Sequence, residues 1–197
     1  MRSAILLSAV FLAAACNSGH AEEGGPQAQR AFEAGAFDKI ALSGSPDVIV
    51  TVGGPPSIRA EGEARELERL EIVAENGQLR IGMRDRSNWF SFGSHRGVTV
   101  HITVPALTAA SVGGSGDIRI DRVQGSSFAA SVAGSGDIDV ATLAVQEASF
   151  SVTGSGGIKA AGRAGRANAA VAGSGDLDLA RLETANATAA VVGSGDI

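Results

Sequence analysis

The second half of the chain repeats a five-residue motif at an almost constant interval, and this repeat limits the fold more than any other feature of the sequence. The motif is Gly-Ser-Gly-Asp-Ile or a close variant, and successive copies begin 20, 20, 19 and 20 residues apart. The copies begin at Gly114, Gly134, Gly154, Gly173 and Gly193. A fixed period of about 20 residues is typical of repeat proteins, in which each repeat packs mainly against its neighbours.

Apolar residues keep fixed positions around each motif. Val stands two residues before the first glycine of every copy, and Ile or Leu stands four residues after it. Two further columns, six and nine residues after the glycine, are Ile120, Val140, Ala160 and Leu179, and Val123, Leu143, Arg163 and Leu182. Because residues two apart share one face of a strand, the pattern predicts short strands joined at glycine corners. We therefore expect an all-β fold in which residues 105–197 form a parallel β-solenoid with coils of about 20 residues.

Residues 37–104 predict an N-terminal β region that precedes the repeats. Strand signals cover Phe37–Leu42, Val48–Val52 and Val98–Val104, and Asn76-Gly77 lies between two alternating runs, as in a hairpin. The stretch Glu63–Leu70 has the composition of one or two helical turns.

The N-terminus has the features of an export signal. Arg2 precedes an apolar run from Ala4 to Ala15, which is too short to span a bilayer. We expect residues 1–15 to be a signal peptide. The segment Ala13-Ala14-Ala15-Cys16 resembles a bacterial lipobox, so we expect Cys16 to be lipidated and residues 16–36 to be a flexible tether. Ordinary secretion, with cleavage after Ala15 or Ala21, is the alternative. Asn17 resembles an outer-membrane sorting signal.

A loop between the N-terminal strands is rich in aromatic and basic residues. Its candidate contact residues are Trp89, Phe90, Phe92, His95 and Arg96. One interpretation is that this loop binds a glycan, a lipid surface or a protein partner. The other is that its aromatic rings close the open end of the solenoid core.

The Gly-Ser-Gly-Asp-Ile repeats, introduced by Val100–Pro105 and Leu107, resemble the putative auto-transporter adhesin head GIN domain family of bacterial envelope proteins, many of which are predicted lipoproteins. The resemblance covers residues 37–197. It implies a right-handed β-helix-like fold and carries no catalytic residues. It also implies further strands after Ile197, so we expect the sequence to be truncated at its C-terminus.

One acidic residue per repeat forms a column. Its members are Asp117, Asp137, Asp176 and Asp196, and Gly157 takes this place in the third repeat. We expect each carboxylate to accept hydrogen bonds from its own turn. Weak binding of calcium along the column is the alternative, although calcium needs 6–8 oxygen ligands.

The next column alternates in charge, with Arg119, Asp139, Lys159 and Asp178. Its neighbours on both sides are apolar, so these side chains should point outward. The alternation suggests a ladder of ion pairs between coils that helps to fix their register, each pair adding about 0–1 kcal/mol.

Enzymatic and nucleic-acid functions find little support in the sequence. The three histidines, His20, His95 and His101, lack a nucleophile or a partner at ligand spacing, and the net charge is −5. No cofactor is expected. We expect a non-enzymatic cell-envelope protein with a structural or adhesin-like role, anchored in the membrane through its N-terminal lipid.

The alternative function is a glycan- or calcium-binding module that uses the Asp column or the aromatic loop. A further expectation is end-to-end stacking between copies, because an open solenoid end exposes unpaired backbone groups.

Overall fold

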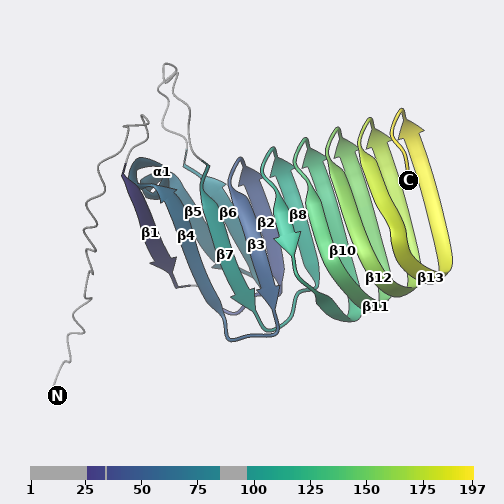
Figure 1. Ribbon diagram of the computed structural model, residues 1–197, viewed down its shortest axis with the longest axis horizontal. Helices are drawn as coiled ribbons and strands as arrows, with labels where there is room; N and C mark the ends of the chain where they lie inside the picture. The colour runs from purple at the N-terminus through teal and green to yellow at the C-terminus, as the bar shows by residue number, and fades with distance from the viewer. Residues whose placement is uncertain (1–25, 34, 85–96) are drawn as a thin grey trace, which may run out of the picture.

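The computed structural model describes residues 26–33, 35–84 and 97–197, which form a β-solenoid whose coils stack along one axis (Figure 1). The expected all-β solenoid with coils of about 20 residues is confirmed. The strands are β1 (Gln27–Phe32), β2 (Lys39–Gly44), β3 (Asp47–Val52), β4 (Ser57–Glu63), β5 (Leu70–Glu75), β6 (Gln78–Met83), β7 (Thr99–Val104), β8 (Ala109–Gly114), β9 (Ile118–Ile120), β10 (Val123–Gly134), β11 (Ile138–Gly154), β12 (Gly157–Gly173) and β13 (Asp176–Gly193). Within the described ranges, the helix is α1 (Ala64–Arg69).

Each repeat forms one coil, and corresponding residues of successive coils lie side by side. The end of β10 pairs in parallel with β8, which places Val132 beside Val112. The same residue pairs with Val152 of β11 on its other side. After the glycine corner, the start of β11 pairs with β9, which places Ile138 beside Ile118. Residues that are 20 positions apart in the sequence are therefore paired in the sheet.

The solenoid also contains strands that precede the repeats. β2 pairs in parallel with β8, which places Gly44 beside Gly114, and β3 pairs in parallel with β9. On their other side, β2 pairs with β6 and β3 pairs with β7, again in parallel. The sheet thus continues across the boundary expected between residues 104 and 105. The coil of β2 and β3 lies between that of β6 and β7 and that of β8 and β9, an order that differs from the order of the sequence (Figure 1).

Antiparallel strands and the helix form the N-terminal end of the solenoid. β4 pairs with β7, β1 pairs with β4, and β5 pairs with β6, all antiparallel. β1 occupies residues 27–32, which were expected to belong to the flexible tether. Its polar sequence gives little burial signal, and it is held by backbone pairing of its whole length with residues 58–63 of β4. The strand expected at Phe37 begins two residues later, at Lys39.

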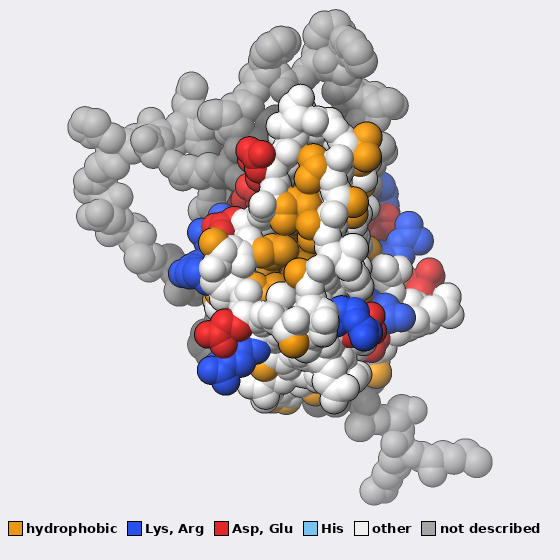
Figure 2. All heavy atoms as spheres, turned by 90° about the vertical axis from the view of Figure 1, so that its right-hand side faces the viewer, with side chains coloured by type: hydrophobic (Ala, Val, Ile, Leu, Met, Phe, Trp, Pro, Cys, Tyr) orange, Lys and Arg blue, Asp and Glu red, His pale blue; other side chains and the backbone are white. Residues whose placement is uncertain are grey.

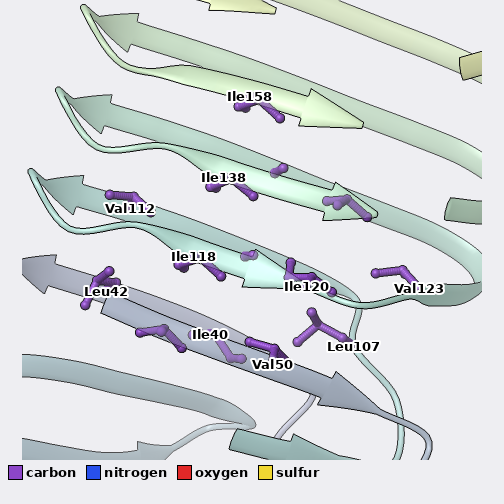
Figure 3. Close-up of a cluster of buried hydrophobic side chains, with 14 of the residues drawn as sticks. Ile40, Leu42, Val50, Leu107, Val112, Ile118, Ile120, Val123, Ile138 and Ile158 are labelled. Carbon is purple, nitrogen blue, oxygen red and sulfur yellow. The ribbon is translucent and has the colours of Figure 1, made fainter. Parts of the chain in front are cut away.

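The inward columns form one continuous apolar core (Figure 3). The valine column is buried at Val112, Val132, Val152 and Val171, each with at most 2% of its surface exposed. Phe128 and Phe150, which come from neighbouring coils, are both 1% exposed. The core is therefore a single stack of mainly aliphatic layers.

One predicted core position is wrong. The third repeat lacks one residue at the corner after Ala160, so Gly162, and not Arg163, lies beside Leu143. Arg163 instead lies outside, where its Nε is 3.0 Å from an oxygen of Glu183 in the next coil. A one-residue deletion turns the side chains that follow it to the other face of the strand. The register shift therefore moves Arg163 out of the apolar column and onto the surface.

The glycine corners allow neighbouring coils to approach closely. The N–H groups of Ser135 and Gly136 both donate to the carbonyl oxygen of Gly114, at 2.9 and 3.1 Å. A Cβ atom at Gly136 would collide with the carbonyl oxygen of Gly116 and lie 3.0 Å from the Val112 side chain. Gly134 has a φ of 143°, in the region that favours glycine. Both glycines of the corner are thus required by close packing, because a Cβ atom at Gly134 would also collide with the carbonyl oxygen of Gly114, and the first is required by its backbone conformation as well.

We predict that Gly136→Ala will destabilise the protein by about 1–3 kcal/mol, because the added methyl group must push two coils apart. The measurement is the free energy of unfolding from urea denaturation followed by circular dichroism. Gly113→Ala is the matched control: Gly113 lies on β8 beside Ala133, and a Cβ there would lie no closer than 3.7 Å to any other atom, an ordinary van der Waals distance. Equal losses in the two variants would contradict the close-packing argument.

Candidate functional site

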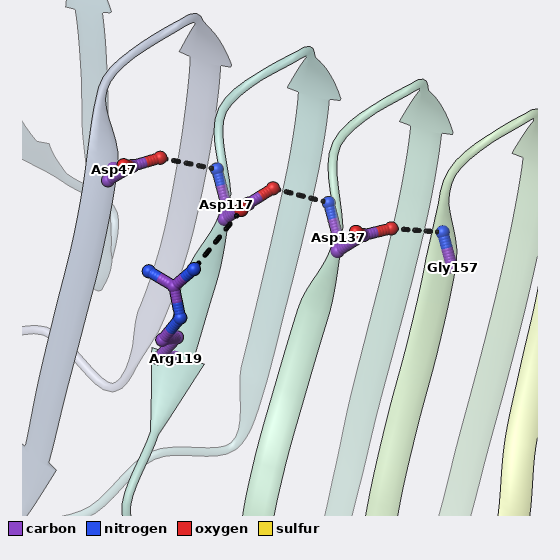
Figure 4. Close-up of polar contacts among 5 residues, drawn as sticks. All are labelled: Asp47, Asp117, Arg119, Asp137 and Gly157. Atoms are coloured by element: carbon purple, nitrogen blue, oxygen red, sulfur yellow. Dashed lines mark hydrogen bonds and ion pairs between the residues drawn. The ribbon is translucent and has the colours of Figure 1, made fainter. Parts of the chain in front are cut away.

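The Asp column is held together by hydrogen bonds that run from coil to coil (Figure 4). Asp117 accepts a hydrogen bond through Oδ1 from the backbone N–H of Asp137, at 3.0 Å. Asp137 accepts in the same way from the N–H of Gly157, at 2.6 Å, and Asp176 from the N–H of Asp196, at 3.0 Å. Each of these carboxylates therefore joins its own coil to the next one.

This geometry corrects the expected turn geometry, in which each carboxylate would bond to its own turn. In a solenoid, the amide directly beside the carboxylate belongs to the next coil. The bonds between Asp117, Asp137 and Gly157 each join residues 20 positions apart. The turn amides have another acceptor, because those of Ser135 and Gly136 donate to the Gly114 carbonyl oxygen.

The column has one more member than the repeat analysis found. Asp47, in the corner between β2 and β3, accepts a hydrogen bond from the N–H of Asp117 at 3.2 Å. The sequence signal was the segment Gly44-Ser45-Pro46-Asp47-Val48, a variant motif with Pro46 in place of the second glycine. It lies 70 residues before Gly114 and so falls outside the 20-residue period of the repeats.

Gly157 interrupts the column. Its N–H donates to Asp137, but it has no carboxylate that could accept from the following coil. The N–H of Asp176 donates instead to the carbonyl oxygen of Gly156, at 3.3 Å. The missing side chain contributes to a surface hollow of about 310 Å³, lined by Asp137, Asp176, Lys159 and other residues of the two charged columns.

At Asp117 both carboxylate oxygens have partners within the protein. One oxygen of Asp117 accepts the bond from the next coil and the other is 3.4 Å from the guanidinium of Arg119. Among the residues that the structure describes, no three His, Cys, Asp or Glu side chains are grouped so as to hold a metal ion.

The charged column next to it forms one ion pair between coils. Lys159 Nζ is 3.0 Å from Asp178, and this hydrogen bond lowers the pKa of the Asp178 carboxyl, with a smaller effect from the Ala180 amide. Because that pKa is lowered in the folded state, the pair stabilises the fold above the unfolded-state pKa and loses this effect as the pH falls through the folded-state value. Arg119 pairs with Asp117 of its own coil, and Asp139 forms no ion pair within the described part of the chain.

A broad surface of small side chains forms the outer side of β8 and of the C-terminal parts of β10 to β13. We call it the small-residue face. Its outward side chains include Ala109, Ser111, Ala129, Ser131, Ser149, Ser151, Asn168, Ala170, Thr188 and Ala190. They alternate with the buried residues of the core, such as Ala130 and Val132. Parallel pairing aligns these small side chains in columns that carry no charge over all five coils, whereas the next outward column contains Glu147 and Arg166.

The remaining candidate residues lie outside the Asp column and the small-residue face. Cys16 and the loop residues Trp89, Phe90, Phe92, His95 and Arg96 lie outside the described residues. His101 lies on the outer side of β7, where its Nε2 is 3.0 Å from Glu61 of β4. Where the structure is described, it contains no helix long and apolar enough to cross a membrane.

We predict that Asp137→Ala will lower the free energy of unfolding by about 0.5–1.5 kcal/mol, because the N–H of Gly157 loses its acceptor. Asp137→Asn keeps an acceptor oxygen and should lose less. Asp139→Asn is the control for removal of a charge, since Asp139 accepts no such bond among the described residues. Urea denaturation measures all three. A loss in Asp139→Asn as large as that in Asp137→Ala would show that charge, and not the bond between coils, is responsible.

Comparison with solved structures finds the same fold in bacterial proteins of low sequence identity. A putative adhesin from Bacteroides fragilis NCTC 9343 has a TM-score of 0.77 at 22% identity, covering 87% of this chain and 79% of the other. A putative adhesin from Parabacteroides merdae ATCC 43184 has a TM-score of 0.66 at 15% identity, covering 87% and 80%. A putative lipid binding protein from Parabacteroides distasonis ATCC 8503 has a TM-score of 0.64 at 17% identity, covering 88% and 98%. Comparison with curated proteins finds no match.

The family model of the putative auto-transporter adhesin head GIN domain matches residues 36–197, which include every repeat and the coil of β2 and β3. The match agrees with the repeated glycine corners, the parallel register and the solenoid fold of the similar structures. The adhesin character of the family favours a non-enzymatic role at the cell surface or in the envelope. The chain belongs to the putative auto-transporter adhesin, head GIN domain family.

Proposed function

We propose that the protein is a lipid-anchored envelope protein with an adhesin-like role, in which the solenoid presents the small-residue face to a partner surface. The observation that carries this proposal is the extent of that face. It continues without a charged side chain from Ala109 on β8 to Ala190 on β13. A flat, uncharged surface can approach another surface closely, because no charge has to be stripped of water on contact.

Under this proposal, the lipid anchor fixes which end of the solenoid lies near the membrane. Eleven residue steps separate Cys16 from Gln27, the first residue of β1. A fully extended chain of that length spans at most about 40 Å. The antiparallel end of the solenoid would thus stay close to the membrane. The C-terminal coils lie at the opposite end of the long axis and would face away from it (Figure 1).

We predict that Cys16→Ser will abolish lipid attachment. The measurement is incorporation of radiolabelled palmitate into the protein in its bacterial host, together with fractionation of membranes. The wild type should carry the label and sediment with membranes, and the variant should do neither. Ser18→Ala is the control for a change in the same segment. A wild-type protein without the label would favour ordinary secretion.

We predict that binding to surface components depends on the small-residue face. Wild-type protein should bind at least one component on an array of glycans and matrix proteins, and the double variant Ser131→Arg, Ser151→Arg should lose at least tenfold in binding. Thr142→Arg is the control, since Thr142 is an exposed residue of β11 that lies outside this face.

The same array decides the alternative function. Binding that requires calcium and is lost in Asp137→Ala, while the arginine variants keep it, would support a glycan- or calcium-binding module on the Asp column. A complete lack of binding would contradict the adhesin-like role.

A further inference from the structure

Strand β1 is attached to the solenoid less extensively than the coils are attached to one another. It pairs with β4 alone, at the edge of the sheet, and the buried core begins after it, at Phe37. None of its six residues is buried, and Ala28 and Phe32 are half-buried against the core. The matched family domain starts at residue 36, so β1 is an addition to that domain from the segment that leads back to Cys16.

A few specific contacts hold β1 at the end of the solenoid. The N–H of Ala64 donates to the carbonyl oxygen of Pro26, at 3.1 Å. The guanidinium of Arg30 donates to the carbonyl oxygen of Leu67, at 3.5 Å, and its Cζ lies 4.8 Å from the centre of the Phe32 ring. Burial of apolar surface is the main favourable term in folding, so a strand this exposed is held mostly by these contacts and by its backbone pairing with β4.

The chain is held more firmly just after β1. The N–H groups of Asp38 and Lys39 both donate to the carbonyl oxygen of Gly77, at 3.1 and 3.3 Å. The strand that follows, β2, pairs with β6 on one side and β8 on the other, and its Leu42 is 1% exposed. A pull on the N-terminus that detaches β1 should therefore stop at Phe37.

Tension along the long axis acts differently on β1 and on the coils, because the strands run across that axis (Figure 1). In the view along the axis, apolar side chains lie in the middle of the coil and charged side chains lie towards its margins (Figure 2). Neighbouring coils are joined by this core and by long strands such as β11, which has 17 residues, and these contacts resist an axial pull together. A pull at Gln27 instead opens the pairing of β1 one residue pair after another.

We propose that β1 is a releasable part of the tether, which detaches from β4 under tension and lengthens the link to the membrane while every coil stays folded. This inference rests on the proposed function, which supplies the anchor at Cys16 and a partner that pulls on the solenoid. With β1 in place, the chain from Cys16 to Gln27 spans at most about 40 Å. With β1 detached, the 21 residue steps from Cys16 to Phe37 span up to about 75 Å. The small-residue face could then stay in contact with a surface that moves away from the cell.

The test is stretching of single molecules at constant force in magnetic tweezers, with the chain from residue 17 onward held by its two ends. This chain keeps every described residue and needs neither lipid nor partner, so its result is separate from that of the Cys16→Ser experiment. We expect a reversible first step of at most about 35 Å, the extended length of residues 27–36. Unfolding of one coil of 20 residues would instead add about 70 Å, and it should occur only after the first step.

A disulfide between β1 and β4 gives the decisive variant. Gln27 and Glu63 are paired across these strands, and the Cα atoms of antiparallel pairs lie about 4.5–5.5 Å apart, which suits a disulfide. The chain from residue 17 onward contains no cysteine, so the double variant Gln27→Cys, Glu63→Cys can form only this disulfide. The first step should vanish in the oxidised variant and return when the same variant is reduced, which is the matched control.

A second pair of variants tests the contact of Arg30 and decides the matter if the cysteine variant fails to fold. Arg30→Ala should raise the opening rate of β1 roughly fivefold at a given force, because it removes a hydrogen bond from a charged group. Arg65→Ala removes an exposed arginine of α1 and should leave the rate unchanged. Three results would overturn the proposal. They are the absence of any step before the first coil unfolds, a first step that persists in the oxidised variant, and equal opening rates in the two arginine variants, which would show that the first step is not the release of β1.

Discussion

The fold depends on how closely successive glycine corners approach each other. In each corner, backbone N–H groups donate to the carbonyl oxygen of the first glycine in the coil before, as Ser155 and Gly156 do to Gly134, at 2.9 and 3.0 Å. This contact is possible only where a Cβ atom is absent from the facing residue. The glycine corner of each coil therefore sets the distance between neighbouring coils. The valine column can then pack in the interior at a spacing that the backbone has already set.

The repeat architecture could be predicted from the sequence because two independent signals had the same period. The glycine corners and the valine column both recur at about 20 residues, and only a parallel stack of coils satisfies both. The same reasoning placed Ile120 and Val140 on the inward face, and both are buried. It failed at Arg163, where the count from the glycine ignored a deletion inside the coil. A charged residue in an apolar column was itself a sign that the deletion lies before Arg163 in the coil.

The N-terminal half could not be predicted to the same extent, because its coils are not continuous in the sequence. The coil of β2 and β3 carries the variant corner Gly44-Ser45-Pro46-Asp47, but the strands that flank it in space come later in the chain. The order of β1 depends on β4 in the same way. The direction of the Asp hydrogen bonds also depends on the stack, since a residue type and its spacing do not reveal which of two nearby amides it accepts from. Local patterns predict local elements, and these features are all set by distant partners.

The inserted coil has a consequence for how the chain acquires its structure during synthesis. Asp38 must meet Thr108, whose N–H and hydroxyl both donate to its carbonyl oxygen, at 2.7 and 3.1 Å. These residues are 70 positions apart. When β2 and β3 leave the ribosome, neither of their neighbouring coils has yet been made, and closing so long a loop is slow. Order cannot therefore spread from the first strand towards the last. The early coil must wait, unpaired, until the chain has passed β6 and β7, and its other side is covered only after β9. During that interval the emerging protein exposes two apolar strands to chaperones and to export machinery.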